Sequence, residues 1–135
     1  MAVNLVYDTL VTNEGYLQFS GVDLNVELSS LVTSDLSDSP APRFIWGVED
    51  WCKDQLMFKY SWNGILTTDH QIDFFKKGVM YQIQYILRNG NISNDSGYNM
   101  STGAIVSREM LDRIGMSANA LTAFRRGGMA NIRRG

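Results

Sequence analysis

The stretch from Thr68 to Gly90 carries the longest consistent periodicity in this chain of 135 residues. Apolar side chains recur in it every three or four residues, the spacing that gathers them on one face of an α-helix. The apolar stripe consists of Ile72, Phe75, Val79, Ile83 and Ile86, widened by Met80 and Leu87. Thr68 and Gln71 form a capping box at the start, and Asn89-Gly90 supplies a left-handed exit. The sequence therefore predicts a helix of about twenty residues, which spans about 30 Å.

One residue inside this predicted helix conflicts with it. Gly78 costs about 1 kcal/mol relative to alanine in a helix interior. A neighbouring helix that crosses closely at this point would explain a residue without a side chain.

A second long helix is expected to begin at Pro40, because Ser39 is a good N-cap and proline fits the first helical turn. Its apolar face contains Phe44, Val48, Trp51, Cys52, Gln55 and Phe58. Its charged face contains Glu49, Asp50, Lys53 and Asp54. Two long amphipathic helices joined by a short loop favour antiparallel pairing. The predicted fold is therefore mainly α, a small antiparallel helical bundle.

The two ends of the chain carry weaker signals. We assign residues 1–39 to an N-terminal arm or loop region, although Leu5–Tyr7 and Tyr16–Phe19 fit short strands or a helical turn. Residues 129–135 form a basic C-terminal tail with nothing local to hold it. Both termini are therefore expected to be flexible.

The chain changes character after Gly90. A polar turn region leads to Ala104–Ser107, a short and partly β-branched run that favours an extended segment at about residues 96–107, as in one arm of a projecting β-hairpin. Arg108–Ile114 fits one or two helical turns. Ser117 then caps a short helix, Ala118 to Arg126, which Gly127-Gly128 ends. In this interpretation residues 40–128 form the helical core domain.

The net charge of −2 conceals an asymmetry along the chain. Residues 1–54 hold nine acidic side chains against two basic ones, a balance of −7, whereas residues 55–135 hold ten basic against five acidic, a balance of +5. An acidic front and a basic end suit head-to-tail contact between copies, or contact with an acidic partner. A scatter of solvated charge is the simpler alternative.

Composition excludes several classes of protein. A hydrophobic content of 44% fits one globular domain of this length. No run approaches the ~20 apolar residues of a membrane span, and no basic region followed by an apolar one begins the chain, so we expect a soluble protein without a membrane partner. One cysteine and one histidine cannot by themselves build a disulfide or a zinc site.

We expect no catalytic, cofactor or metal site. His70 lies at an exposed helix start without a nucleophile motif elsewhere, which indicates a surface role. Cys52 lies in mid-helix on the apolar face, where burial disfavours a reactive thiolate. Five carboxylates remain as candidates for a metal site, but they are spread along an arm and a helix face, which favours solvated surface. They are Asp35, Asp38, Glu49, Asp50 and Asp54. An enzyme therefore has no supporting constellation.

Aromatic and arginine residues are the more informative groups. The first long helix and its end are rich in aromatic residues, namely Trp46, Trp51, Phe58, Tyr60 and Trp62. Trp51 falls on the predicted core face and Trp46 nearer the opposite one, so core packing and a subunit interface both account for them. The pairs Arg125-Arg126 and Arg133-Arg134 would suit phosphate groups. No recognition-helix motif accompanies them.

The order of these parts resembles the head–tail connector (adaptor, or head-completion) proteins of tailed bacteriophages. The resemblance covers roughly residues 40–130 and includes Arg43-Phe-Ile-Trp-Gly-Val-Glu-Asp-Trp51 on the first helix. The other motifs are Phe75-Lys-Lys-Gly-Val-Met-Tyr-Gln-Ile-Gln-Tyr-Ile-Leu-Arg-Asn-Gly90, Ser93-Asn-Asp-Ser-Gly-Tyr98, Thr102-Gly-Ala-Ile-Val-Ser-Arg108 and Ser117-Ala-Asn-Ala-Leu-Thr-Ala-Phe-Arg-Arg-Gly-Gly-Met129. The departures are Gly-Gly-Met where Ala-Gly-Leu is commoner, the acidic stretch before residue 39, and the basic tail.

The resemblance implies a structural virion protein that is not an enzyme. Such a subunit assembles as a ring, dodecameric in the family, between the portal and the next neck or tail protein, and the ring extends the DNA channel. Assembly would take place in the cytoplasm of the bacterial host. The expected contacts with portal, neighbouring subunits and passing DNA are made by Tyr98, Ile105, Val106, Arg125, Arg126, Arg133 and Arg134. The alternative is a small nucleic-acid-binding or regulatory protein that uses the C-terminal arginine cluster.

Overall fold

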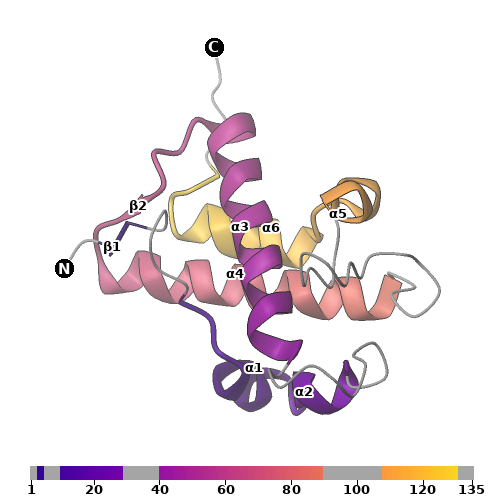
Figure 1. Cartoon of the computed structure of the whole chain (residues 1–135). Helices are drawn as coiled ribbons and strands as arrows, with labels where there is room; N and C mark the ends of the chain where they lie inside the picture. The colour runs from indigo at the N-terminus through magenta and orange to yellow at the C-terminus, as the bar shows by residue number, and fades with distance from the viewer. Residues whose placement is uncertain (1–2, 5–9, 29–39, 90–107, 131–135) are drawn as a thin grey trace.

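The computed structural model describes residues 3–4, 10–28, 40–89 and 108–130 (Figure 1). This part of the chain is mainly helical, as the sequence predicts, with one short two-stranded ladder. Its elements are β1 (Val3–Asn4), α1 (Asn13–Ser20), α2 (Leu24–Glu27), α3 (Pro40–Tyr60), β2 (Ile65–Leu66), α4 (Asp69–Asn89), α5 (Arg108–Ile114) and α6 (Ala118–Arg126). The strands β1 and β2 are antiparallel, with Val3 opposite Leu66.

The helix α4 confirms the most strongly predicted element. Four residues of its stripe, Phe75, Val79, Ile83 and Ile86, are fully buried, and Ile72 is partly buried against them. At its start the N–H of Gln71 donates to the Thr68 hydroxyl at 3.1 Å, as expected of an N-cap. The Gln71 side-chain oxygen accepts from the N–H and the hydroxyl of Thr67, each at 2.8 Å. In the predicted capping box the Gln71 side chain would accept the N–H of Thr68. In the structure it accepts from Thr67, one residue earlier.

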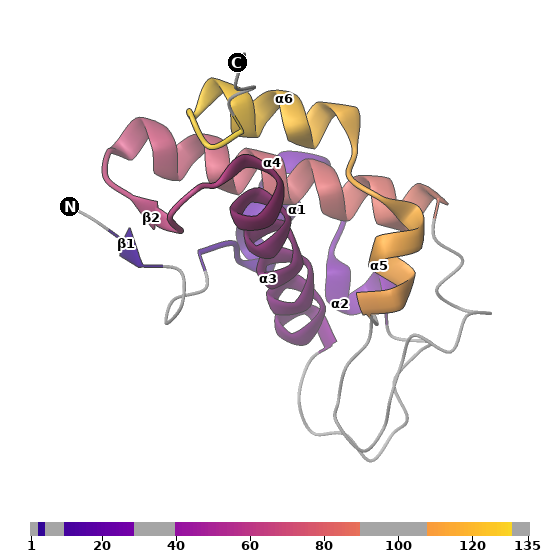
Figure 2. The ribbon, with the colours of Figure 1, turned by 90° about the horizontal axis from the view of Figure 1, so that it is seen from above.

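The partner that lies along α4 is α6, and the two helices run antiparallel (Figure 2). A Cβ atom built on Gly78 would come within 2.3 Å of the Phe124 ring. The missing side chain therefore makes room for Phe124, which is fully buried and lies 5.7 Å from the ring of Phe75. The close helix that Gly78 suggested is α6.

The helix α3 crosses α4 steeply instead of running beside it (Figures 1 and 2). The antiparallel pairing expected for these two long helices is therefore wrong. Two features of the chain explain the difference. The connection at residues 61–68 contains β2, which pairs with β1, so it is not a tight helix hairpin. In addition, α6 already covers the flank of α4 that contains Gly78.

Residues 10–28 belong to the core, where we expected an arm or loop. Tyr16 of α1 and Leu24 of α2, together with Leu28, are almost completely buried. Thr12 caps α1 by accepting the Gly15 N–H at 3.0 Å. Of the two alternatives for Tyr16–Phe19, the helical one is correct. The helices α1 and α2 are too short to show a clear apolar period, which is why the sequence did not distinguish them from irregular structure.

The C-terminal helices α5 and α6 occur where the sequence predicts them. Ser117 caps α6 by accepting the N–H groups of Asn119 and Ala120 at 3.2 and 3.4 Å. Beyond α6, however, Met129 and Ala130 are buried and do not belong to a free tail. Gly128, with a left-handed φ of 81°, turns the chain back, and the Met129 N–H donates to the Phe124 carbonyl at 2.9 Å. The predicted extended segment at residues 96–107 lies outside the described residues.

Candidate functional site

Only two of the predicted contact residues lie in the described part of the chain. Arg125 and Arg126 occupy the last turn of α6, and both are exposed. The others fall outside the described ranges, namely Tyr98, Ile105, Val106, Arg133 and Arg134. The two described arginines are not equivalent, because Arg126 lines a hollow between helices and Arg125 does not. Two hollows and one exposed apolar surface are the candidate sites.

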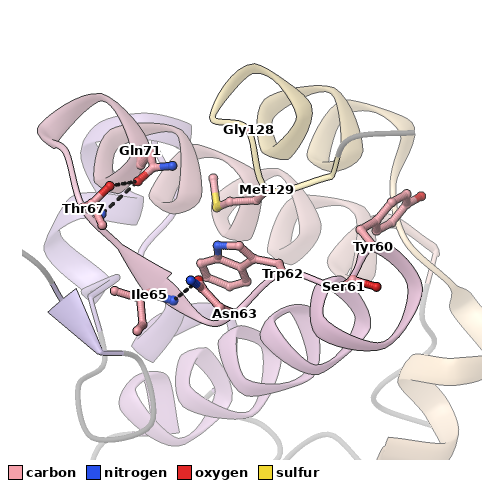
Figure 3. Close-up of a pocket in the computed structure, with 9 residues that line it drawn as sticks. All are labelled: Tyr60, Ser61, Trp62, Asn63, Ile65, Thr67, Gln71, Gly128 and Met129. Carbon is pink, nitrogen blue, oxygen red and sulfur yellow. Dashed lines mark hydrogen bonds between the residues drawn. The ribbon is translucent and has the colours of Figure 1, made fainter. Parts of the chain in front are cut away.

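The first hollow, of about 360 Å³, opens where α3 ends and the chain turns toward α4 (Figure 3). We call it the Trp62 hollow. It is lined by Tyr60, Ser61, Trp62, Asn63, Ile65, Thr67, Gln71, Gly128 and Met129. Figure 3 shows the Trp62 ring in the middle of this set, with the Met129 side chain beside it and Gln71 on the opposite wall. An indole and a thioether thus give this hollow an apolar base.

Local backbone geometry builds the Trp62 hollow. Ser61 has a left-handed φ of 56° and Gly64 has one of 79°, so the chain reverses twice within a few residues. The Asn63 side-chain oxygen accepts the Ile65 N–H at 3.0 Å, which fixes the second reversal.

The ring of Trp62 packs near that of Phe75, with the two ring centroids 5.8 Å apart. The indole of Trp62 and the side-chain amide of Gln71 both line the hollow. The hollow therefore combines polar N–H groups with an apolar base, a combination that suits a protein surface with exposed carbonyl groups.

Large apolar side chains are exposed at the end of α3 and just after it, in the segment that leads into this hollow. Phe58 is 85% exposed, Met57 39% and Ile65 37%. The Met57 sulfur lies 3.5 Å from the position that a Cβ on Gly64 would take, so the end of α3 touches the turn that precedes Ile65. We call Met57, Phe58, Trp62 and Ile65 the α3-end surface. Trp46, 60% exposed, is on the same helix but eleven residues before Met57.

The second hollow, of about 350 Å³, lies between α1, α4 and α6. We call it the α4–α6 groove. It is lined by Phe19, Phe74, Lys77, Tyr81, Asn119, Thr122, Ala123 and Arg126. The sequence pointed to Arg126 alone. The three aromatic residues and Lys77 come from other segments, and nothing in their spacing indicated that α1 and α6 would bring them together.

The carboxylates of α3 are largely engaged in contacts within the chain. Arg108 of α5 forms ion pairs with Asp50 at 3.2 Å and with Asp54 at 2.7 Å. Lys53 pairs with Asp50 at 3.0 Å. The expectation of simple solvated surface is therefore wrong for Asp50 and Asp54, which dock α5 on α3. Ion pairs of this exposure contribute little energy each, so their main consequence is to fix orientation.

Glu49 departs furthest from the expected solvated surface, since it is only 4% exposed. Its carboxylate accepts the Leu10 N–H at 3.1 and 3.2 Å and the Val11 N–H at 3.0 Å. Burial raises the pKa of Glu49, and these two backbone bonds act against the increase. Helical spacing placed Glu49 on the polar face. It is buried because the chain before α1 lies over that edge of α3, which the period of α3 alone cannot show.

The two residues with reactive side chains lie as predicted. Cys52 is fully buried, and burial raises the pKa of its thiol well above the usual range. His70 is exposed, and its Nε2 lies 3.1 Å from the Arg126 carbonyl oxygen. Its ring packs on Phe74 with centroids 4.7 Å apart. His70 thus joins the start of α4 to the end of α6.

Comparisons with protein-family models, with curated proteins and with solved structures find no match. Within the described residues, no three His, Cys, Asp or Glu side chains are grouped so as to hold a metal ion. None of the described helices is both long and apolar enough to cross a membrane. The arrangement is suited to binding, through the α3-end surface and the two hollows.

Proposed function

We propose that this protein is a structural subunit of a tailed-phage virion, one that assembles as a ring between the portal and the neck or tail. The proposal rests on the sequence resemblance and on one structural observation, the α3-end surface. Phe58 is 85% exposed there, two residues before Tyr60, which lines the hollow whose base is Trp62 and Met129. Exposed apolar clusters of this kind are typical of protein–protein interfaces.

The exposed ring of Phe58 is energetically unfavourable in water. Burying a phenylalanine side chain that was in water contributes about 1.5–3 kcal/mol. Inside the chain Phe58 gains almost none of this, because the packed face of α3 points elsewhere. A neighbouring protein that covers Phe58, Met57 and Ile65 would recover that energy. The end of α3 would therefore gain stability from assembly.

Charge supports the ring less than the sequence suggested. The excess of acidic residues in residues 1–54 includes Glu49, which is buried, and Asp50 and Asp54, which are paired with Arg108. Three of the nine acidic side chains of residues 1–54 are thus engaged within one subunit. The contact that we propose between copies is accordingly apolar at the end of α3, with different patches of neighbouring subunits meeting as ring closure requires.

The proposal extends to segments outside the described residues. Residues 96–107 would project as an extended segment and contact the next subunit through Tyr98, Ile105 and Val106. The tail would contact the portal, and Arg133 and Arg134 would face the DNA channel together with the end of α6. The ordering of such segments on assembly offsets part of the interface energy.

The test is to mix the purified protein with the portal of the same phage and to examine the particles by negative-stain electron microscopy. We expect a ring on one end of the portal. Phe58→Ser should abolish or strongly reduce it, whereas the matched variant Trp46→Ser, which replaces the other exposed aromatic side chain of α3, should not. Undecorated portals with the unaltered protein would contradict the proposal.

A second candidate, a small nucleic-acid-binding or regulatory protein, is favoured by one observation. The α4–α6 groove places Arg126 and Lys77 together with three aromatic rings. A gel shift against random duplex DNA at low and moderate salt separates the two functions. Tight and sequence-selective binding by single subunits would favour regulation, whereas weak and strongly salt-dependent binding fits a channel component.

A further inference from the structure

The α4–α6 groove has a regular construction. The helix α4 contributes Phe74, Lys77 and Tyr81, which follow the spacing i, i+3, i+7 and therefore share one face. The helix α6 contributes Asn119, Thr122 and Arg126 with the same spacing. Phe19 of α1 lies against Tyr81, with ring centroids 5.0 Å apart in an edge-to-face arrangement. Two helix faces and one ring thus enclose the hollow of about 350 Å³.

The antiparallel course of the two helices gives the groove two different ends. At one end the start of α4 meets the end of α6. There His70 contacts the Arg126 carbonyl, and the Phe74 Cβ lies 3.1 Å from the position of a Cβ on Gly127. At the other end Gln82 binds the N–H of Ser117 at 2.8 Å, which brings its neighbour Tyr81 close to the start of α6. The first end is cationic, and the second is formed by Tyr81, Phe19 and the amide of Asn119.

The positive charge at the cationic end is only partly neutralised. Lys77 forms an exposed ion pair with Asp73 at 3.1 Å and lies 5.0 Å from the centre of the Phe74 ring. No acidic side chain of the described residues pairs with the Arg126 guanidinium, whose fork geometry matches a phosphate group. The charge at this end therefore attracts an anion, and both cations line the same hollow.

We propose that the α4–α6 groove binds a nucleoside phosphate, either free or as a unit of a single nucleic-acid strand. The phosphate binds at Lys77 and Arg126. The base packs on Tyr81 and Phe19, since aromatic side chains stack with any base, and the Asn119 amide meets its polar edge. The hollow is within the size range of small-ligand sites.

Each half of the groove argues against a simpler ligand. A bare phosphate would make no use of the aromatic end, and an apolar ligand would make no use of the two cations. The site is a different surface from the α3-end surface, so this inference holds whether or not the protein forms a ring.

The experiment is a titration of the full chain with thymidine monophosphate, with a short oligothymidylate and with inorganic phosphate. The first two are expected to bind, and inorganic phosphate at least tenfold more weakly, because it lacks the base. If the strand binds much more tightly than the mononucleotide, the natural ligand is a strand; if both bind alike, it is a free nucleotide. Equal binding of all three ligands, or no binding of either nucleotide, would overturn the proposal.

The chain provides matched controls in the neighbouring residues. Lys77→Gln and Arg126→Gln should each weaken nucleotide binding by about tenfold or more, the usual loss of a charge-assisted hydrogen bond. Lys76→Gln and Arg125→Gln remove the same charges one residue outside the groove and should have little effect. Equal losses for both sets would indicate general electrostatic attraction and would contradict a defined site. Thermal melting confirms that each variant is folded.

The aromatic end has its own test. Tyr81→Leu should weaken nucleotide binding and leave the weak binding of inorganic phosphate unchanged. A variant that binds nucleotide as tightly as the unaltered protein would show that the rings take no part, and would overturn the assignment of the base.

Discussion

Phe124 and Phe58 are the same residue type near the ends of two helices, and the molecule treats them in opposite ways. Phe124 of α6 is fully buried over Gly78, and any side chain at position 78 would occupy the space of its ring. Phe58 of α3 is 85% exposed, two residues before Tyr60, where the lining of the Trp62 hollow begins. The α4–α6 contact around Phe124 is completed within one chain, whereas the end of α3 has an apolar surface that the described part of the chain leaves uncovered. The difference indicates where this fold is closed and where it is open to a partner.

The largest expected effect comes from a substitution at the α4–α6 contact. Phe124→Ala should destabilise the protein by about 3–5 kcal/mol, because it removes a buried ring and leaves a cavity between α4 and α6. Urea denaturation measures the change. A loss below about 1 kcal/mol would show that the α4–α6 contact is not a tight one.

Gly78→Ala tests whether the absence of a side chain at this position allows the close α4–α6 contact. The added methyl group would overlap the Phe124 ring, and overpacking of this kind costs about 1–3 kcal/mol despite the better helix propensity of alanine. In a Phe124→Ala background the ring is absent, so the same substitution should become neutral or stabilise by up to about 1 kcal/mol. A double-mutant cycle by denaturation reports the coupling. Additive effects would contradict direct contact between the two residues.

Glu49 tests whether the N-terminal segment belongs to the closed part. Glu49→Ala should cost about 1–3 kcal/mol, because the N–H groups of Leu10 and Val11 lose their acceptor. Glu49→Gln retains one acceptor oxygen and should cost less. Denaturation midpoints of the two variants provide the measurement, and an unchanged stability of Glu49→Ala would mean that this segment is not held by Glu49.

The pH dependence of stability gives an independent test of the same contact. Burial raises the pKa of Glu49 above its usual value of 4.5, so the folded state keeps this proton to higher pH than the unfolded state does. The contribution of Glu49 to stability is therefore greatest below pH 4.5 and decreases as the pH rises through the raised value. Glu49→Gln should lack this decrease. If the unaltered protein instead gains stability relative to Glu49→Gln over that range, the pKa is lowered and the contact is stronger than burial implies.

The smallest expected effect concerns the open side. Phe58→Ala should change the stability of the isolated chain by no more than about 0.5 kcal/mol, as for other exposed positions. The change in unfolding free energy is to be compared with that of Phe124→Ala, measured in the same way. A loss comparable to that of Phe124→Ala would show that Phe58 is packed within its own chain.

The long-range order of the fold was harder to predict than its helices. The strong periods of α3 and α4, the caps at Thr68 and Ser117, and a close neighbour at Gly78 follow from local spacing and composition. The choice of α6 in place of α3 as the antiparallel partner of α4 depends on Phe124 fitting Gly78, a contact between distant residues that no local period records. The short helices α1 and α2 have too few turns for a clear pattern, and they fold because Tyr16, Leu24 and Leu28 pack on the longer helices.

For the candidate sites too, the sequence indicated single residues but not the contacts between distant residues. The sequence singled out Arg126 and the aromatic residues of α3, but it placed Phe58 on the packed face of that helix, whereas the structure has Phe58 85% exposed. It did not show that Lys77, Tyr81 and Phe19 share a groove with Arg126, because three separate helices contribute them. It also assigned Glu49 and Asp54 to solvent, since the period of one helix cannot reveal that a segment or another helix covers its polar face.

The most direct test of the open end of α3 is hydroxyl-radical footprinting of Phe58 and Met57, in the isolated protein and after mixing with the portal. We expect strong labelling of both side chains in the isolated protein and protection of both in the mixture, with Phe124 unlabelled throughout. Equal labelling of Phe58 with and without the portal, in particles that contain both proteins, would contradict it.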